Sequence, residues 1–292
     1  MMKTNFHTHT YRCGHAVGDE RDMVRSAIDA GMEVLGFSEH IALPHYRKHL
    51  LKGLPNTIGH FRPFASACRA IIKNGPAMRL SYQQLPIHLA KVKQLKDEYQ
   101  QQITIYQGFE AEYFEEYLDY YQELLDSGKA DYLILGNHFH KYSVATNYYG
   151  KVNISDDEII KYKDDLLKAL DTDLFTYVAH PDLFMVGKVY FDDLCKNITR
   201  EICQKALEKD IPLEVNAGGI RRGYRKVNDE MLYPYPNAHF FEIVSEMGCK
   251  VILGIDVHSP DHFNQEDIEA LEKFVKRHQL KVVTMPKFKK GK

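Results

Sequence analysis

The chain has 292 residues, with 38 lysines and arginines against 40 aspartates and glutamates. This balance argues against a dedicated nucleic-acid-binding protein, which usually carries a basic excess. No run of 18 apolar residues and no apolar signal core is present, which argues against a membrane role. The five cysteines are odd in number and lack zinc-finger spacing. A disulfide framework is therefore not expected, and we expect a cytoplasmic protein.

Two kinds of segment alternate along the chain. Short apolar, β-branched runs predict seven strands and a further one near the C-terminus, over residues 3–6, 34–37, 103–107, 132–135, 176–178, 213–215, 250–253 and 281–284. Amphipathic segments predict helices over residues 20–30, 87–101, 115–127, 156–170, 192–209, 238–247 and 265–278. This alternation indicates an α/β fold built on a parallel sheet, open or closed.

One segment interrupts the alternation. Residues 41–85 separate the second and third predicted strands and carry scattered basic residues, among them Arg47, Lys48 and Arg79. A long insertion at a strand end is often a lid or a substrate loop, and a peripheral helical excursion is the alternative. No repeat and no Pro-, Gly- or Ser-rich linker marks a boundary, so we expect residues 1–292 to form a single domain with this insertion.

A histidine or a carboxylate follows nearly every predicted strand. In chain order the stretches FHTHTYRCGH, GFSEH, GFEAEY, GNH, AHPD and GIDVHSP supply His7, His9, His15, His40, Glu110, His138, His180, Asp256 and His258. The carboxyl ends of parallel barrel strands meet on one side, so these side chains are expected to converge. His7 and His9 are spaced to point to the same side of a strand, and Asp256 and His258 share this spacing.

The types of these residues indicate the class of metal. Imidazole and carboxylate donors without a thiolate favour Zn, Mn or Fe over Mg or Ca. Nine ligands are too many for one ion, so we expect two or three. Glu110 and Asp256 offset only part of the positive charge of such ions, which favours an anionic substrate. Paired metal ions can generate hydroxide at neutral pH and hold phosphoryl oxygens, so a phosphate ester is the expected substrate.

These motifs, in this order from residue 5 to about 262, resemble the polymerase-and-histidinol-phosphatase (PHP) family. The resemblance implies a distorted (β/α)7 TIM-like barrel with a trinuclear metal site at the C-terminal ends of the strands. The insertion and the LEVNAGGIRRG stretch look most like the histidinol-phosphate phosphatases of the family. This implies hydrolysis of L-histidinol phosphate to L-histidinol and phosphate, in histidine biosynthesis. The last motif reads GIDVH where the commoner form is SDAH, but both ligands remain.

The resemblance also implies how the ligands divide among the ions. Three sets are expected: His7, His9, Glu110 and Asp256; His15, His40 and His258; and Glu110, His138 and His180. Glu110 is preferred to Glu112 as the bridging residue because it directly follows the Gly-aromatic pair, as in the GxE of the family. Glu110, Asp256 and His258 are the expected catalytic residues.

Substrate-binding residues are expected after the sixth strand. Arg221 and Arg222 follow it, and at least one of them is expected to contact the substrate phosphate, because guanidinium groups match phosphate oxygens. Arg221 is the preferred candidate, and an exposed pair in a solvated turn is the alternative. Arg12, near the first motif, is a similar candidate. Glu214 and Asn216 are expected either to support the metal ligands or bind substrate, or to form a buried hydrogen-bonded pair on the strand.

The remaining histidines are expected to serve surface or packing roles: His45, His49, His60, His88, His239, His262 and His278. His140 stays open because it lies two residues beyond His138 and could share its face.

Other functions stay open at this point. One is a PHP-family phosphatase acting on another small phosphate ester, a nucleotide or the 3′ end of DNA. Amidohydrolase-type barrels also begin with His-x-His, but His15, His40 and a third-strand Glu110 fit their pattern poorly. A complete ligand set argues against a non-catalytic metal-binding domain. We therefore expect a small-molecule phosphate ester as the partner, with no nucleic acid, no membrane and an undetermined oligomeric state.

Overall fold

A computed structural model describes residues 2–45, 64–65, 68, 78–140 and 148–289 of the chain. Most of the predicted insertion at 41–85 therefore lies outside the described residues, together with His49 and His60.

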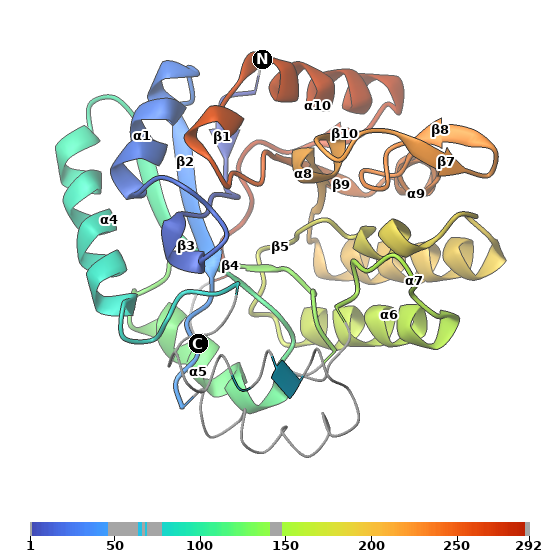
Figure 1. Ribbon diagram of the computed structural model, residues 1–292, viewed down its shortest axis with the longest axis horizontal. Helices are drawn as coiled ribbons and strands as arrows, with labels where there is room; N and C mark the ends of the chain where they lie inside the picture. Colours follow the sequence, from blue (N-terminus) through green and yellow to red (C-terminus); the bar gives the residue numbers. More distant parts are fainter. Residues whose placement is uncertain (1, 46–63, 66–67, 69–77, 141–147, 290–292) are drawn as a thin grey trace.

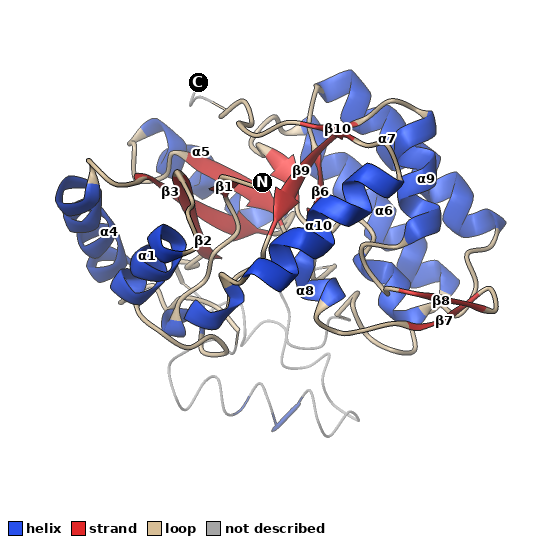
Figure 2. Ribbon diagram, turned by 90° about the horizontal axis from the view of Figure 1, so that it is seen from above, coloured by secondary structure: helices blue, strands red, loops and turns tan. Residues whose placement is uncertain are grey.

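One curled sheet of eight parallel strands forms the centre of the molecule (Figures 1 and 2). Its order is β1 (Thr4–Asn5), β2 (Val34–His40), β3 (Thr104–Ala111), β4 (Tyr132–Leu135), β5 (Tyr177–Val178), β6 (Leu213–Asn216), β9 (Lys250–Gly254) and β10 (Lys281–Val282). The two ends of the sheet approach each other. The Thr4 hydroxyl donates to the Thr284 carbonyl at 2.8 Å, and Thr8, just beyond β1, forms a parallel bridge with Val257.

This arrangement confirms the predicted α/β barrel class. The sheet holds one strand more than a (β/α)7 barrel because the predicted segment 281–284 pairs with β9 as β10.

Helices surround the sheet on its outer face, as Figure 2 shows. They are α1 (Glu20–Asp29), α4 (Leu85–Tyr99), α5 (Leu118–Asp126), α6 (Asp156–Asp171), α7 (Asp193–Lys209), α9 (Ala238–Glu246) and α10 (Gln265–Arg277), with the short α8 (Ala217–Ile220) beside β6 in sequence. Ser155 and Glu158 form the capping box that begins α6, so that predicted helix start is confirmed. Within the described part of the chain, none of the helices has the length and apolar character needed to cross a membrane.

Short 3-10 turns connect several strands to the helices. They are η1 (Tyr11–Cys13), η3 (Glu115–Tyr117), η4 (Leu183–Gly187) and η5 (Pro260–His262). An antiparallel hairpin of β7 (Arg225–Val227) and β8 (Glu230–Leu232) lies apart from the main sheet and was not predicted. Its strands have three residues each, too few to show an alternating apolar pattern.

The interior of the curled sheet is filled by its own small core, distinct from the larger core beneath the helices. It consists of the buried residues Phe6, Tyr132, Ile134, Tyr177, Ala179 and Ile252. The Tyr132 hydroxyl lies 2.8 Å from the Phe6 carbonyl and 2.7 Å from that of Phe37, so it satisfies main-chain groups inside the barrel. A Cβ at Gly108 would lie 2.4 Å from the Tyr132 ring, so this glycine makes room for it.

Phe288, in the basic C-terminal segment, closes this inner core from the end of the barrel where the strands begin. Its ring centroid lies 5.8 Å from that of Phe6, 4.9 Å from that of Tyr106 and 5.2 Å from that of Tyr132. The C-terminal segment therefore packs against the barrel through the ring of Phe288.

Candidate metal centre

The nine predicted ligands gather at the end of the sheet where the strands finish. His7 and His9 follow β1, His138 follows β4, and His180 follows β5. His40 is the last residue of β2, and its register partner on β3 is Glu110. Both strands run further than predicted, so His40 and Glu110 lie within them and not beyond them.

Main-chain pairing places the two i, i+2 pairs side by side. The His9 N–H donates to the Val257 carbonyl at 2.8 Å, and the Val257 N–H donates to the His7 carbonyl at 3.0 Å. Because alternate residues of extended chain face the same side, His7 and His9 lie opposite Asp256 and His258. His7 Nε2 is 3.5 Å and His9 Nε2 is 3.7 Å from Asp256 Oδ1.

Glu110 lies at the centre of the cluster, and five imidazoles surround its carboxylate. Oε2 lies 3.5 Å from His7 Nε2, 3.4 Å from His9 Nε2 and 3.1 Å from His40 Nδ1. Oε1 lies 3.0 Å from His180 Nε2 and 3.6 Å from His138 Nε2. The two oxygens thus face two separate groups of histidines, the arrangement expected of a bridging carboxylate.

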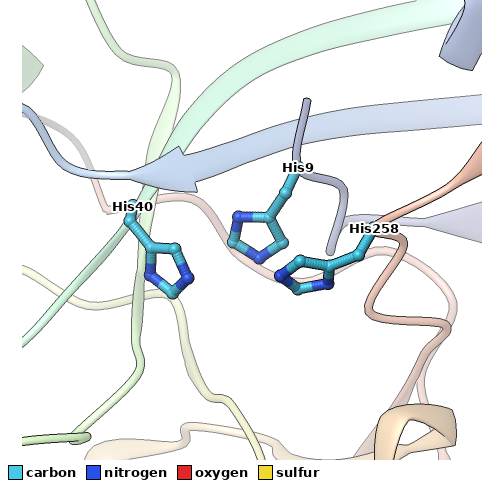
Figure 3. Close-up of side chains that lie close together, drawn as sticks. All are labelled: His9, His40 and His258. Atoms are coloured by element: carbon cyan, nitrogen blue, oxygen red, sulfur yellow. The ribbon is translucent and has the colours of Figure 1, made fainter. Parts of the chain in front are cut away.

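A second group of imidazoles lies beside the first. Figure 3 shows His9, His40 and His258 projecting into one region from three different segments. The ring of His9 stacks on that of His40 at 4.4 Å and on that of His258 at 4.3 Å. His15 joins this group, with its Nε2 atom 2.9 Å from His258 Nε2. All nine predicted ligands are therefore in one contiguous cluster.

The cluster has the features of a site that holds cations. The ring nitrogens His7 Nε2, His9 Nε2 and His180 Nδ1 are buried without a hydrogen-bond partner among the described residues. Unsatisfied buried nitrogens are costly unless another group takes their lone pairs. Three-residue subsets with donor atoms within 4.8 Å of one another include His7, His9 and Asp256, and also His9, His40 and His258. Imidazole and carboxylate donors of this kind fit divalent transition metals.

Electrostatics keep the two carboxylates ionised. Burial of Glu110 opposes its ionisation, but His138, His7 and His40 outweigh this and hold the pKa of the carboxyl well below its usual value. Burial likewise opposes ionisation of Asp256, and His7 and His258 lower its pKa well below the usual value. For His9, burial itself lowers the pKa well below the usual value, so this ring stays neutral with a lone pair available.

Buried carboxylates lie on the Nδ1 side of three of the imidazoles. Glu214 Oε1 accepts from His7 Nδ1 at 2.8 Å, and Glu112 Oε1 lies 3.3 Å from His138 Nδ1. Glu39 Oε2 is 4.0 Å from His9 Nδ1. The first two partners fix the ring orientations of His7 and His138 and leave their opposite nitrogens for a metal. Glu39 Oε2 and His9 Nδ1 make no hydrogen bond with each other.

Close-packed glycines make room for this arrangement. A Cβ at Gly254 would lie 1.8 Å from Glu214 Oε1, and one at Gly218 would lie 2.6 Å from Asp256 Oδ2. Asp256 itself has a φ of 56°, an uncommon conformation for a residue with a side chain. The backbone of this motif is therefore shaped to present the Asp256 carboxylate to the cluster.

A cavity of about 280 Å³ opens onto the cluster. His15, His40, Glu110, His138, His180, Asp256 and His258 are on its wall, and the remaining lining residues include Met78, Tyr148, Arg221, Arg222, Tyr235 and His262. Met78 belongs to the predicted insertion, so the end of that segment reaches the cavity.

The predicted substrate-binding residues occupy different places. Arg221 and Arg222 line the cavity. Asn216 caps α8 by accepting from the Gly218 N–H at 2.7 Å, and it donates to Glu214 at 2.7 Å. Arg12 pairs with the buried Glu20 at 2.6 Å. The structure thus brings two of the four to the cavity and gives Asn216 and Arg12 structural partners.

The two cavity arginines differ in their contacts. Arg221 donates to Asp267 at 2.7 Å and to the carbonyls of Ile255 and Asp256 at 2.9 and 2.6 Å. It therefore braces the segment that carries Asp256. Arg222 lies with its guanidinium 5.5 Å from the ring centroid of Tyr235, and it forms no ion pair with a carboxylate within the described ranges.

Several residues of the site were not predicted. His262 was expected to have a surface or packing role, but it lines the cavity. Its spacing of four from His258 was the available signal. Tyr148 and Tyr235 lie in irregular segments without a periodic pattern. His140, whose role the sequence leaves open, has its Nδ1 atom 2.8 Å from Asp165 Oδ2 and does not line the cavity.

The chain is similar to a family of known domains, to a curated protein and to a solved structure. The PHP domain family model matches residues 5–218. A curated relative from Deinococcus radiodurans, named "Probable histidinol-phosphatase", is 22% identical over 265 residues, which cover 87% of this chain and 85% of the relative. A solved structure of histidinol phosphate phosphatase from Lactococcus lactis, complexed with zinc, L-histidinol and phosphate, is similar with a TM-score of 0.67 at 15% identity. The match covers 98% of this chain and 99% of that one.

Proposed function

The chain belongs to the PHP domain family, and from this premise we propose that it is a metal-dependent phosphomonoesterase that hydrolyses L-histidinol phosphate to L-histidinol and phosphate. The observation that carries the proposal is the convergence of five imidazoles on Glu110 at the wall of a cavity that also presents Arg222. A cluster of metal-ligand type next to an arginine suits an anionic phosphate ester.

Three groups of side chains would hold the metal ions. The contacts of Glu110 Oε2 and Asp256 Oδ1 support a first set of His7, His9, Glu110 and Asp256. His15, His40 and His258 would form the second set, and Glu110 Oε1 with His138 and His180 the third. When bound, divalent ions supply positive charge that polarises phosphoryl oxygens and makes hydroxide available from water at neutral pH.

Arg222 is the residue of the chain that we assign to the phosphate group. Its guanidinium remains a cation at every physiological pH and can donate two parallel hydrogen bonds to phosphate oxygens. Tyr148 and Tyr235 flank it on the same cavity wall, and the Tyr235 ring holds it in place. Arg221 contributes indirectly because its three contacts fix the segment that carries Asp256.

The relatives support the choice of substrate. The chain covers most of the length of the Deinococcus radiodurans protein and nearly all of the Lactococcus lactis structure, which contains the two products of histidinol phosphate hydrolysis. The cavity also has the aromatic and apolar walls that an imidazole ring requires, contributed by Phe139, Tyr148 and Leu183. These features favour histidinol phosphate over a nucleotide or a general phosphate ester.

The test is phosphate release by the purified protein with added manganese or zinc. L-histidinol phosphate, a nucleoside monophosphate and p-nitrophenyl phosphate are compared under the same conditions. We expect kcat/KM for L-histidinol phosphate to exceed the other two by about 100-fold or more, the discrimination available to a shaped pocket. Equal kcat/KM values for all three esters would refute the proposed specificity for L-histidinol phosphate but would still support phosphate ester hydrolysis. No phosphate release from any ester by metal-loaded protein would refute the proposed function.

A further inference from the structure

His262 occupies a position at the cavity that the ligand sets leave unexplained. It ends the 3-10 turn η5, four residues after His258, and its main-chain N–H donates to the Ser259 carbonyl at 2.9 Å. Its side chain is partly buried and lines the same cavity as Arg222 and the metal-ligand cluster. It is therefore placed to meet whatever enters that cavity.

One hydrogen bond fixes the protonation of the His262 ring. The main-chain N–H of His258 donates to His262 Nδ1 at 3.1 Å. A ring nitrogen can accept only when it carries no proton, so the imidazole must be neutral with its proton on Nε2.

The fixed tautomer gives His262 a defined chemical role. Nδ1 is occupied by the main chain of a predicted metal ligand, which leaves the Nε2–H group as a neutral donor. A phosphate ester has oxygens that accept such a hydrogen bond, and hydrogen bonds to charged groups are stronger than neutral ones. Among the described residues of this wall, Arg221 is already committed to Asp267 and to main-chain carbonyls, so it does not supply this donor.

We propose that His262 is a substrate-binding residue that donates its Nε2–H to a phosphate oxygen of the bound ester. The proposal rests on the proposed function, because it takes the cavity to be the site of a phosphate ester. It adds to Arg222 a second contact that is neutral and directional. It also explains why a histidine, with two distinct ring nitrogens, suits this position: one holds the loop and the other meets the substrate.

Two substitutions separate these two nitrogens. His262→Asn places an amide oxygen near the position of Nδ1, so it can still accept from the His258 N–H, but it has no atom at the position of Nε2. His262→Gln places an amide nitrogen near the position of Nε2 and retains the donor. His278→Gln is the matched control, because His278 lies beyond the end of α10, packs on Phe274 and does not line the cavity.

The experiment is calorimetric binding of inorganic phosphate to metal-loaded protein, with metal content measured on the same samples. We expect His262→Asn to weaken phosphate binding about tenfold or more, the effect of losing a hydrogen bond to a charged group. His262→Gln should stay within about threefold of the unsubstituted protein, and His278→Gln should be unchanged. Metal content should be the same in all four proteins.

Three outcomes would overturn the inference. The first is an unchanged phosphate affinity of His262→Asn. The second is an equal decrease in phosphate affinity in His262→Gln and His262→Asn. The third is a decrease in metal content in both variants. Since binding needs no turnover, the result is distinct from that of the proposed function. If phosphate binding depends on His262 as expected while L-histidinol phosphate is not hydrolysed, the inference stands and the proposed reaction fails.

Discussion

At the scale of single residues, Glu214 shows how the cluster is held in shape. This buried carboxylate accepts from His7 Nδ1 at 2.8 Å and from the His180 main-chain N–H at 3.0 Å. Asn216 donates to the same Oε2 atom at 2.7 Å. His7 and His180 belong to different proposed ligand sets, so this one side chain contacts members of both sets.

Replacing Glu214 by Gln should weaken metal binding. Glutamine keeps the size of the side chain but removes the charge that holds the proton on His7 Nδ1. We expect metal affinity to fall about 10- to 100-fold, as for other carboxylates that support a ligating histidine. Chelator competition with zinc measures this directly. Glu208→Gln on the exposed surface of α7 is the control. If the zinc affinity of Glu214→Gln is within twofold of that of Glu208→Gln, Glu214 does not orient the ligands.

The sequence predicts the nine ligands better than their supporting residues. His7 and His9 or Asp256 and His258 are recognisable because their short spacing follows from extended backbone geometry. The contact between Glu214 and His7 joins residues 207 positions apart, and no local pattern encodes it. The cavity role of His262 was missed for a related reason: its spacing of four from His258 does not by itself indicate a cavity position, which depends on the packing of η5 and Arg221.

At the scale of elements, a buried ionic network connects η1, α1 and α4 behind the metal centre. Glu20, at the start of α1, accepts from Arg12 at 2.6 Å and lies 2.7 Å from His88 Nδ1. Burial would raise the pKa of Glu20, but its hydrogen bonds with His88 and Arg12 outweigh this and lower the pKa to about 2. The network thus favours the ionised carboxylate in the folded protein.

This network predicts a pH-dependent contribution to stability. An unfolded glutamate has a pKa of about 4.3, so the stabilisation by Glu20 is complete above that pH and is lost as the pH falls through 2. We expect Glu20→Gln to lower the free energy of unfolding by about 2–3 kcal/mol at pH 7 and by less at pH 3. Urea unfolding of the two metal-free proteins at both pH values measures the difference. A difference that is as large at pH 3 as at pH 7 would contradict the assignment.

The predicted elements agree with the structure where a clear apolar pattern exists. β4 (Tyr132–Leu135) has the predicted bounds, and α7 begins one residue later than predicted. β2 and β3 extend further than predicted, through His40 and Glu110, whose polar side chains interrupt the apolar pattern that indicates a strand. Polar residues at these positions belong to the site, where function overrides the usual alternation.

At the scale of the whole molecule, one end of the barrel carries the candidate metal centre and the other end is closed by aromatic packing. The end where strands finish carries the metal-ligand cluster, and the other end is closed by Phe288 over Phe6, Tyr106 and Tyr132. The order of motifs along the sequence predicted the first end through the geometry of parallel barrels. The second end was not predicted, because a basic segment such as 287–292 resembles a solvated tail.

Phe288→Ala should therefore affect stability and not chemistry. Loss of a partly buried ring is expected to lower the free energy of unfolding by about 1–3 kcal/mol, less than for a fully buried phenylalanine. Metal content and kcat/KM should be unchanged at temperatures where both proteins are folded. Met285→Ala, at a site that is 46% exposed in the same segment, is the control for urea unfolding. A selective loss of metal in Phe288→Ala would show that the two ends are coupled.

We propose that the cluster around Glu110 and Asp256 holds the metal ions on which phosphate ester hydrolysis depends. The most direct measurement is the rate of phosphate release from L-histidinol phosphate after chelation and after re-addition of metal, for the unsubstituted protein and for Asp256→Asn. We predict that chelation abolishes activity, that zinc or manganese restores it, and that Asp256→Asn lowers kcat/KM by about 100-fold or more even with metal present. Full activity after chelation, or undiminished activity of Asp256→Asn, would contradict the account.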